Sequence, residues 1–200
     1  MFDLLSPMVP DPVTLRNEVV TLEPMDVRHA RDLCDAIDDG VFAFMPMRSS
    51  VKTINEVRRY VEFQVRRPST ITFAVIDNAT GRAVGSTSYL NIRADHRGLE
   101  IGSTWISKAS RGTKINPAMK HLMLSHAFET LGAVRVELRT DGRNAQSRKA
   151  IEKLGARFEG MMRAHMIMPD GVSRDTAVYS IVREEWKAID LQLMSRLGIN

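Results

Sequence analysis

The chain has 200 residues, of which 44% are hydrophobic and 26% charged, a composition typical of a globular domain that argues against a disordered or fibrous protein. It contains no apolar run of the roughly 18–20 residues that a membrane-spanning helix needs, and its first residues lack the basic start and apolar core of a signal peptide. A net charge of +4 suits an anionic ligand but is weaker than that of most dedicated nucleic-acid-binding proteins.

Residues 1–17 are expected to form a proline-rich N-terminal arm, and residues 18–200 a single domain without internal repeats. In chain order, the hydrophobic periodicity and the turn signals predict a strand at 18–23, helices at 26–37 and 53–67, strands at 71–77, 83–92 and 99–107, a helix at 117–131, a strand at 134–140, a helix at 145–154, strands at 157–168 and 176–182, and a helix at 184–197. Hairpins come early and late, with strand–helix alternation between them. This order predicts an α/β domain with a mixed sheet of about seven strands and helices on both faces.

The stretch SRGTKINPAMK, residues 110–120, combines a basic, glycine-containing turn with the start of a helix. Asn116 is a favoured N-cap and Pro117 a favoured first helical residue, so the helix is expected to begin there. A helix N-terminus offers unpaired backbone N–H groups and the positive end of the helix dipole, and Arg111 and Lys114 add charge beside it. The stretch therefore predicts a phosphate-binding turn, with a plain basic loop as the alternative.

Three motifs occur in a fixed order in the middle of the chain. They are the strand Glu100-Ile101-Gly102, the turn from Arg111 to Asn116, and Asn144-x-x-Ser147 opening a helix that Leu154-Gly155-Ala156 closes. Together they resemble the GNAT superfamily of acyl-CoA-dependent N-acetyltransferases, in particular the branch similar to the ribosomal-protein N-acetyltransferases RimJ and RimL, from about Glu18 to Arg183. The resemblance implies a GNAT-like, mostly antiparallel twisted sheet and acetyl-CoA as the acyl donor.

In that family the turn has the pattern R/Q-x-x-G-x-G/A, and its backbone N–H groups wrap the pyrophosphate of coenzyme A. The resemblance therefore assigns the pyrophosphate to six consecutive residues: Arg111, Gly112, Thr113, Lys114, Ile115 and Asn116. Lys114 and Asn116 depart from the pattern because they stand at the two small positions. The pantetheine arm is expected along the backbone of Trp105, Ile106 and Ser107, with Asn144 and Ser147 beside it.

Glu100 is the candidate general base, because a carboxylate can take the proton that the attacking amine must lose. In the family a glutamate near this position often acts directly or through water. The alternative is a structural carboxylate paired with Arg93 or Arg97. Asp141 is a weaker candidate for the base.

The departing thiolate needs a proton donor, and many family members place a tyrosine four residues after the serine of the N-x-x-S motif. Here that position is Ile151, so Ser147 becomes the candidate. Its alternative role is hydrogen bonding within the first helical turn. Asn144 is expected both to cap this helix and to contact the pantetheine amide.

The acceptor amine is expected between the first two helices, their loop and the late hairpin. Four residues of that loop suggest an adaptable apolar wall, although ordinary core positions are the alternative: Phe42, Phe44, Met45 and Met47. The histidines show no spacing typical of metal ligands, so no metal is predicted. The single cysteine, Cys34, excludes an intrachain disulfide framework and favours the cytoplasm.

The leading hypothesis is an N-acetyltransferase that moves an acetyl group from acetyl-CoA to a primary amine, a peptide N-terminus or a small molecule, by direct attack in a ternary complex. The first alternative is a CoA-binding sensor of the same fold with little catalysis. A nucleic-acid-binding module is a third hypothesis, based on the basic 135–157 region, but that region lacks aromatic residues for stacking. No membrane partner is expected, and a homodimer through the C-terminal helix is possible.

Overall fold

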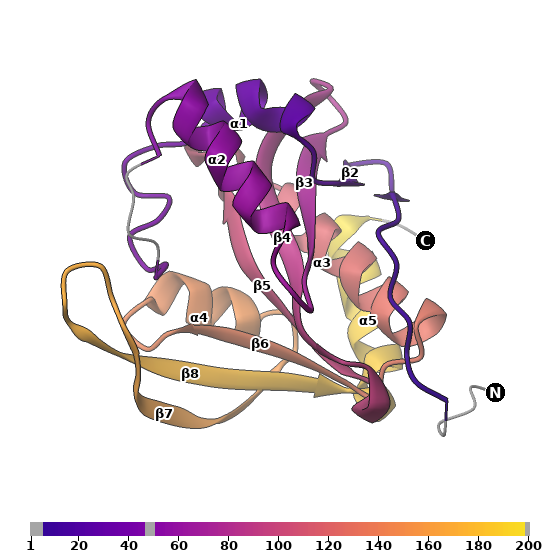
Figure 1. Ribbon diagram of the computed structural model, residues 1–200. Coiled ribbons are helices and arrows are strands. Elements are labelled where there is room, and N and C mark those ends of the chain that lie inside the picture. Colours follow the sequence, from indigo (N-terminus) through magenta and orange to yellow (C-terminus); the bar gives the residue numbers. More distant parts are fainter. Residues whose placement is uncertain (1–5, 47–50, 199–200) are drawn as a thin grey trace.

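The computed structural model describes residues 6–46 and 51–198, in which eight strands form one sheet with five α-helices around it (Figure 1). The strands are β1 Leu15–Arg16, β2 Val20–Pro24, β3 Ile71–Asp77, β4 Arg82–Arg93, β5 Gly98–Ile106, β6 Arg135–Asp141, β7 Arg157–Ile167 and β8 Ser173–Val182. The helices are α1 Ala30–Ala36, α2 Ile54–Val65, α3 Ile115–Ser125, α4 Ala145–Glu152 and α5 Arg183–Leu197. The predicted α/β fold is confirmed, and the eighth strand is the two-residue β1, which is too short to show a periodicity.

Two predicted helices differ from the observed ones. The segment at 26–37 begins with a 3-10 turn, Val27–His29, before α1, and the segment at 117–131 is α3 followed by a π-helical turn, His126–Thr130. The N-terminus of α2 is as predicted: Thr53 Oγ1 accepts from the Glu56 N–H at 3.3 Å, and the Glu56 carboxylate accepts from the Thr53 N–H at 2.8 Å. This capping box satisfies two N–H groups that the helix leaves unpaired.

The sheet has the strand order β1-β2-β3-β4-β5-β6-β8-β7. Within the described residues, β5 and β6 are the parallel pair and the other neighbours are antiparallel. The crossover from β5 to β6 runs through α3, as a parallel connection requires. The sheet is therefore mixed and mostly antiparallel.

Two apolar layers hold the helices to opposite faces of the sheet (Figure 1). On one face, α3, α4 and α5 share a core with the inner strands that includes Tyr89, Met119, Ile151 and Trp186. On the other face, α1 and α2 pack in a second cluster that includes Trp105. Because successive side chains of a strand point to opposite faces, β5 contributes to both layers.

The parallel pairing of β5 and β6 is short. It joins Gly98, Leu99 and Glu100 to Arg135, Val136 and Glu137, after which β5 continues to Ile106 and β6 to Asp141 without further pairing to each other. A bulge in β5 lies at the divergence, where Ser103 has a φ of +46° and the register with β4 shifts. A bulge bends its strand. The two central strands therefore separate, and the β5 backbone beyond Glu100 is open on its β6 side.

Candidate active site

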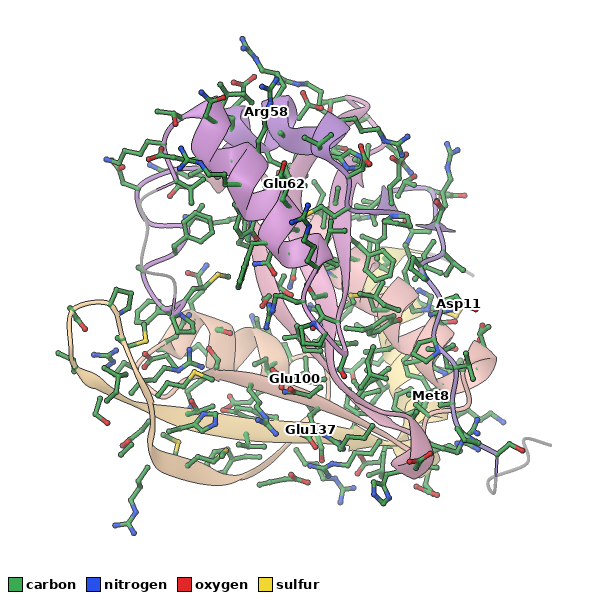
Figure 2. The ribbon with its side chains drawn as sticks, in the orientation of Figure 1. Met8, Asp11, Arg58, Glu62, Glu100 and Glu137 are labelled. Carbon is green, nitrogen blue, oxygen red and sulfur yellow. The ribbon has the colours of Figure 1, made fainter. Side chains whose placement is uncertain are left out.

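Glu100 lies at the last paired position before β5 and β6 separate, beside Glu137 on the neighbouring strand (Figure 2). The residue is 7% exposed, and its carboxylate accepts a hydrogen bond from Asn91 Nδ2 at 2.7 Å. Burial raises the pKa of the Glu100 carboxyl, and the charge of Arg139 partly opposes this effect. A carboxylate held in this way has the raised proton affinity that a general base uses.

The ion pairs around Glu100 differ from the predicted alternative. Arg93 donates to Glu137 at 2.7 Å, and Arg97 donates to the carbonyls of Leu131 and Gly132. The arginine near Glu100 is instead Arg139, whose Nε lies 3.5 Å from Glu100 Oε2 and whose Nη2 donates to Glu137 at 2.6 Å.

The neighbouring carboxyl, Glu137, titrates in the opposite direction. Burial raises the pKa of Glu137, but the hydrogen bond from Arg139 and the charge of Arg93 outweigh burial and lower it. Of these two adjacent carboxyls, Glu100 has the raised pKa that suits a proton acceptor, and Glu137 has a lowered pKa that favours its ionised form.

The turn before α3 has the geometry of an anion site, but its helix begins earlier than predicted. Gly112 has a φ of +78°, a conformation that favours glycine, and its missing Cβ would meet nothing within 4 Å. Thr113 Oγ1 accepts from the Ile115 N–H at 3.3 Å and donates to the Ser110 carbonyl at 2.7 Å. Helix α3 starts at Ile115 with Lys114 in the N-cap position, so the prediction that Asn116 is the N-cap was wrong.

Lys114 stands where the family has a small residue, and its side chain is directed away from the turn. Its Nζ donates to the Leu197 carbonyl at 2.8 Å, at the C-terminus of α5. Its φ is −70°. A lysine fits here because this position needs no positive φ and because cations are favoured at helix C-termini.

Arg111 lies between the turn and the rest of the site. Its Nη2 donates to the Asp38 carboxylate at 2.7 Å, and its Nε donates to the Ile106 carbonyl at 3.3 Å. The Ile106 carbonyl therefore faces away from β4, on the side where β5 is unpaired. The Ser107 N–H, by contrast, donates to the Val84 carbonyl at 2.8 Å.

Trp105 is a core residue that packs beneath the loop after α1. It is 4% exposed, and its indole Nε1 donates to the Tyr60 hydroxyl at 3.1 Å. The Phe42 ring packs edge-on against it, with ring centroids 5.8 Å apart. The loop after α1 is thereby anchored to β5.

Asn144 caps α4 as predicted: its Oδ1 accepts from the Ser147 N–H at 3.0 Å. Ser147 is half-buried in the first turn of that helix. Ile151, one turn further on, is 7% exposed and packs in the core, so this position offers no polar group.

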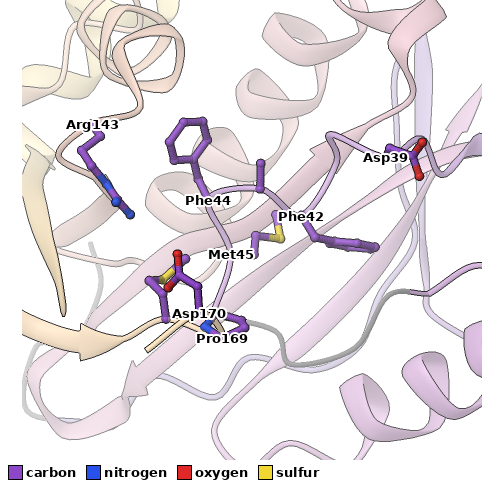
Figure 3. Close-up of a pocket in the computed structure, with 9 residues that line it drawn as sticks. Asp39, Phe42, Phe44, Met45, Arg143, Pro169 and Asp170 are labelled. Carbon is purple, nitrogen blue, oxygen red and sulfur yellow. The ribbon is translucent and has the colours of Figure 1, made fainter. Parts of the chain in front are cut away.

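A pocket of about 460 Å³ lies between the loop after α1 and the turn that joins β7 to β8 (Figure 3). Its lining is Asp39, Phe42, Ala43, Phe44, Met45, Arg143, Met168, Pro169 and Asp170. Three residues of the predicted apolar wall line it, and the fourth, Met47, lies outside the described residues. The pocket combines aromatic and thioether groups with two carboxylates and one guanidinium.

Lys120 was not among the site residues predicted from the sequence. It lies on α3 and is 6% exposed. Its Nζ donates to Thr104 Oγ1 at 2.9 Å, on the part of β5 that is not paired with β6. Burial lowers the pKa of Lys120 to about 7, and the charge of Glu100 opposes this shift. The sequence pattern that could have identified it is a lysine on the apolar side of an amphipathic helix, one turn before Met123.

Two further properties concern ligands and membranes. Among residues 6–46 and 51–198, no three histidine, cysteine, aspartate or glutamate side chains gather as metal ligands would. In the same part of the chain, no helix combines the length and the apolar character needed to cross a bilayer.

Comparisons with known proteins agree with this geometry. Residues 20–157 match the family described as an acetyltransferase (GNAT) domain. A Bacillus subtilis (strain 168) protein named "Putative ribosomal N-acetyltransferase YdaF" is 32% identical over 107 residues, which are 54% of this chain and 57% of that relative.

Two solved structures extend the likeness over nearly the whole chain. The structure of a GCN5-related N-acetyltransferase from Brucella melitensis is 28% identical, with a TM-score of 0.91 over 96% of this chain and 89% of that one. The structure of Mycobacterium smegmatis RimJ in complex with CoA-disulfide has a TM-score of 0.77 over 96% and 97% of the two chains. At 22% identity, that second likeness concerns the fold alone.

Proposed function

The chain belongs to the GNAT family of acetyltransferases, and we propose that it transfers the acetyl group of acetyl-CoA to a primary amine by direct attack in a ternary complex. The observation that carries this proposal is the separation of β5 from β6 directly after Glu100, next to the turn that begins α3. An extended acyl-CoA arm could pair with the open β5 edge as an additional strand. The reacting carbonyl would then lie close to a buried carboxylate.

The turn supports the donor half of the reaction. Gly112 leaves the approach to the backbone open, and the side chain of Lys114 is occupied at α5 and does not crowd the turn. The N–H groups at the start of a helix have no partner within the helix, so they can donate to a pyrophosphate; the Ile115 N–H would exchange its long bond to Thr113 Oγ1 for one to the ligand. We assign Arg111 through Asn116 to the pyrophosphate, and Trp105, Ile106, Ser107, Asn144 and Ser147 to the pantetheine arm.

Glu100 is assigned to the acceptor half as general base. The neutral amine attacks the thioester carbon, its nitrogen loses a proton to the Glu100 carboxylate, and the C–S bond breaks with its electron pair on sulfur. Backbone N–H groups along the open edge of β5 would stabilise the oxyanion. Holding both substrates in this cleft would supply much of the rate.

We place the acceptor in the pocket between the loop after α1 and the β7–β8 turn. The pocket opens on the face of the sheet that carries Trp105 and the α1–α2 layer, and Asp39 and Asp170 give it negative charge. A small amine or a peptide N-terminus fits these properties. The cytoplasm is the proposed location, and a homodimer stays a prediction.

The first test is calorimetric titration of acetyl-CoA into the protein, with desulfo-CoA as a second ligand. We expect micromolar binding that the Arg111→Ala variant weakens about tenfold, because a charged hydrogen bond to phosphate is lost. Arg58→Ala, which removes an exposed arginine on α2, is the matched control and is expected to bind normally.

Turnover separates the enzyme from a CoA-binding sensor. Release of free thiol should be followed with a panel of small amines and short peptides. Tight binding without release from any acceptor would favour the sensor, which the apolar Ile151 would suit. Absence of binding to either ligand would refute both functions.

A further inference from the structure

Lys120 is a charged side chain in a position that normally holds an apolar one. It lies between the buried residues Met119 and Met123 on the sheet-facing side of α3 and is itself 6% exposed. Within the described part of the chain, its one hydrogen-bond partner is Thr104 Oγ1, which also bonds Thr87 Oγ1 at 2.8 Å. Burying an ammonium group without an ion-pair partner is costly, so a lysine here needs an explanation other than packing.

The position of Thr104 on β5 shows which face of the sheet Lys120 contacts. Leu99 and Ile101 of β5 face the α3 layer, whereas Glu100 between them faces the opposite side, next to Glu137. After the bulge at Ser103, Trp105 lies in the α1–α2 cluster. The Thr104 side chain accordingly points to α3, and Lys120 meets it there.

Glu100 and Lys120 thus lie on opposite faces of β5, near the point where β5 separates from β6. Glu100 is the charged group on β5 whose field acts on Lys120, whereas the other contacts named here, with Thr87, Thr104 and the two methionines, are uncharged. A base on one face and an ammonium on the other is the arrangement that an acyl transfer between two nucleophiles can use.

No tyrosine of the chain is placed to donate a proton to the leaving thiolate. The three tyrosines of the chain are buried and bonded elsewhere: Tyr60 to Trp105, Tyr89 to the Met123 carbonyl, and Tyr179 to Glu152. Ile151, where the family resemblance led us to look for a tyrosine, is packed in the core on the same side of the sheet as Lys120 and has no proton to give.

We propose that the Lys120 ammonium group protonates the sulfur of coenzyme A as the thiolate leaves. This inference rests on the proposed function. As the C–S bond breaks, its electron pair stays on sulfur, one Nζ–H proton moves to that sulfur, and Lys120 becomes a neutral amine. The proton lost by the acceptor amine is held by Glu100 on the other face. Solvent then takes the proton from Glu100 and returns one to Lys120, so charge and atoms balance over a turnover.

The test uses Lys120→Met, which keeps an unbranched side chain up to the ε position and removes the ammonium group. We expect kcat with acetyl-CoA to fall at least tenfold, and the decline of the wild-type rate above pH about 7 to disappear, because that decline follows deprotonation of Lys120. Affinity for desulfo-CoA should stay within about threefold. Lys187→Met, at an exposed position of α5, is the matched control and should keep the wild-type profile.

Changing the leaving group separates a catalytic role of Lys120 from a structural one, because a purely structural effect would leave the ratio of wild-type to variant rates unchanged. The wild-type and variant rates should be compared with the acetyl ester of an aryl thiol, which is more acidic than an alkyl thiol with its pKa of about 8.5. The rate ratio should shrink towards one, because an acidic thiol leaves without a proton. An unchanged ratio would overturn the proposal.

Two further variants keep the test decisive. Lys120→Gln retains a donor to Thr104 and replaces the methionine variant if that one does not fold; it should show the same loss. Ser147→Ala should retain the decline above pH about 7, and its disappearance there would assign the proton to Ser147 and overturn the proposal. A wild-type protein that binds acetyl-CoA but acetylates nothing would refute the proposed function itself.

Discussion

Arg111 donates to the Asp38 carboxylate at 2.7 Å, and this ion pair joins the loop after α1 to the turn before α3. The same loop continues through Asp39 to Met45 along the wall of the pocket. The turn assigned to the acyl donor and the pocket assigned to the acceptor are therefore connected through one charged contact. Any anion that takes Arg111 from Asp38 also releases one end of the pocket wall.

We expect Asp38→Asn to bind CoA about two- to fivefold more tightly than the wild type. The carboxylate competes with the pyrophosphate for Arg111, and a partly exposed ion pair contributes about 0.2–1 kcal/mol. Asparagine can still accept from the Gly40 N–H, as Asp38 does at 2.9 Å, so the loop should keep its shape.

Calorimetry with CoA alone measures this effect. Asp35→Asn is the control, because it removes the same charge from the end of α1, where Asp35 pairs with Arg82 instead of Arg111. Equal gains in both variants would indicate a general effect of charge. Weaker binding in Asp38→Asn would show that the ion pair positions Arg111 for the phosphate.

Gly112→Ala is expected to lower both stability and CoA affinity. An alanine Cβ meets nothing within 4 Å, so the cost is the backbone conformation at a φ of +78°, about 1–2 kcal/mol. Relaxation of that strain would move the N–H groups of the turn. Gly81→Ala is a matched control, since Gly81 has a φ of +69° and equally open space in the β3–β4 turn.

Thermal unfolding should show similar losses for the two glycine variants, whereas calorimetry should show weaker CoA binding for Gly112→Ala alone. If Gly112→Ala binds CoA normally, the turn does not need its backbone conformation for the ligand.

Tyr60→Phe is expected to destabilise the protein by about 1–3 kcal/mol. The Trp105 indole N–H donates to this hydroxyl in a buried position, and removing the acceptor leaves the N–H unsatisfied. Chemical denaturation measures the loss. Adding Trp105→Phe to Tyr60→Phe removes both partners, so the double variant should lose less than the sum of the single ones. Additive losses would mean that the hydrogen bond contributes nothing.

The sequence was most informative where local rules determine the structure. The strand at 71–77 is a run of β-branched and apolar residues, and it was predicted with its observed bounds. Asn144 was recognised as a cap because its oxygen bonds an N–H only three residues away.

Contacts between distant segments could not be read in the same way. Lys114 reaches the carbonyl of Leu197, and this partner explains a departure from the family pattern that had no local explanation. Arg139 lies near Glu100 because of the parallel register of β5 and β6, whereas the sequence favoured the nearer Arg93 and Arg97. The burial of Lys120 depends on how α3 is rotated on the sheet. The sequence showed only that Lys120 is spaced along the helix like its apolar neighbours.

Glu100→Gln is expected to reduce kcat about 10²-fold or more without loss of CoA binding, as removal of a general base does. The active form of Glu100 is the carboxylate. The wild-type rate should therefore fall as pH is lowered through the pKa of Glu100, which burial raises above the ordinary value of about 4.3. The glutamine variant should lose this acidic limb, and Glu137→Gln should retain it, because Arg139 and Arg93 lower the pKa of Glu137.

Protonation of the acceptor amine also slows the reaction at low pH, so the profile should be measured with two acceptors of different pKa. The limb that belongs to the amine moves with the acceptor, whereas the limb that belongs to Glu100 stays in place. If the fixed limb persists in Glu100→Gln, another group takes the proton, and Asp141→Asn is the next variant to test, although Arg143 lowers the pKa of Asp141 and so makes it a weaker base than Glu100.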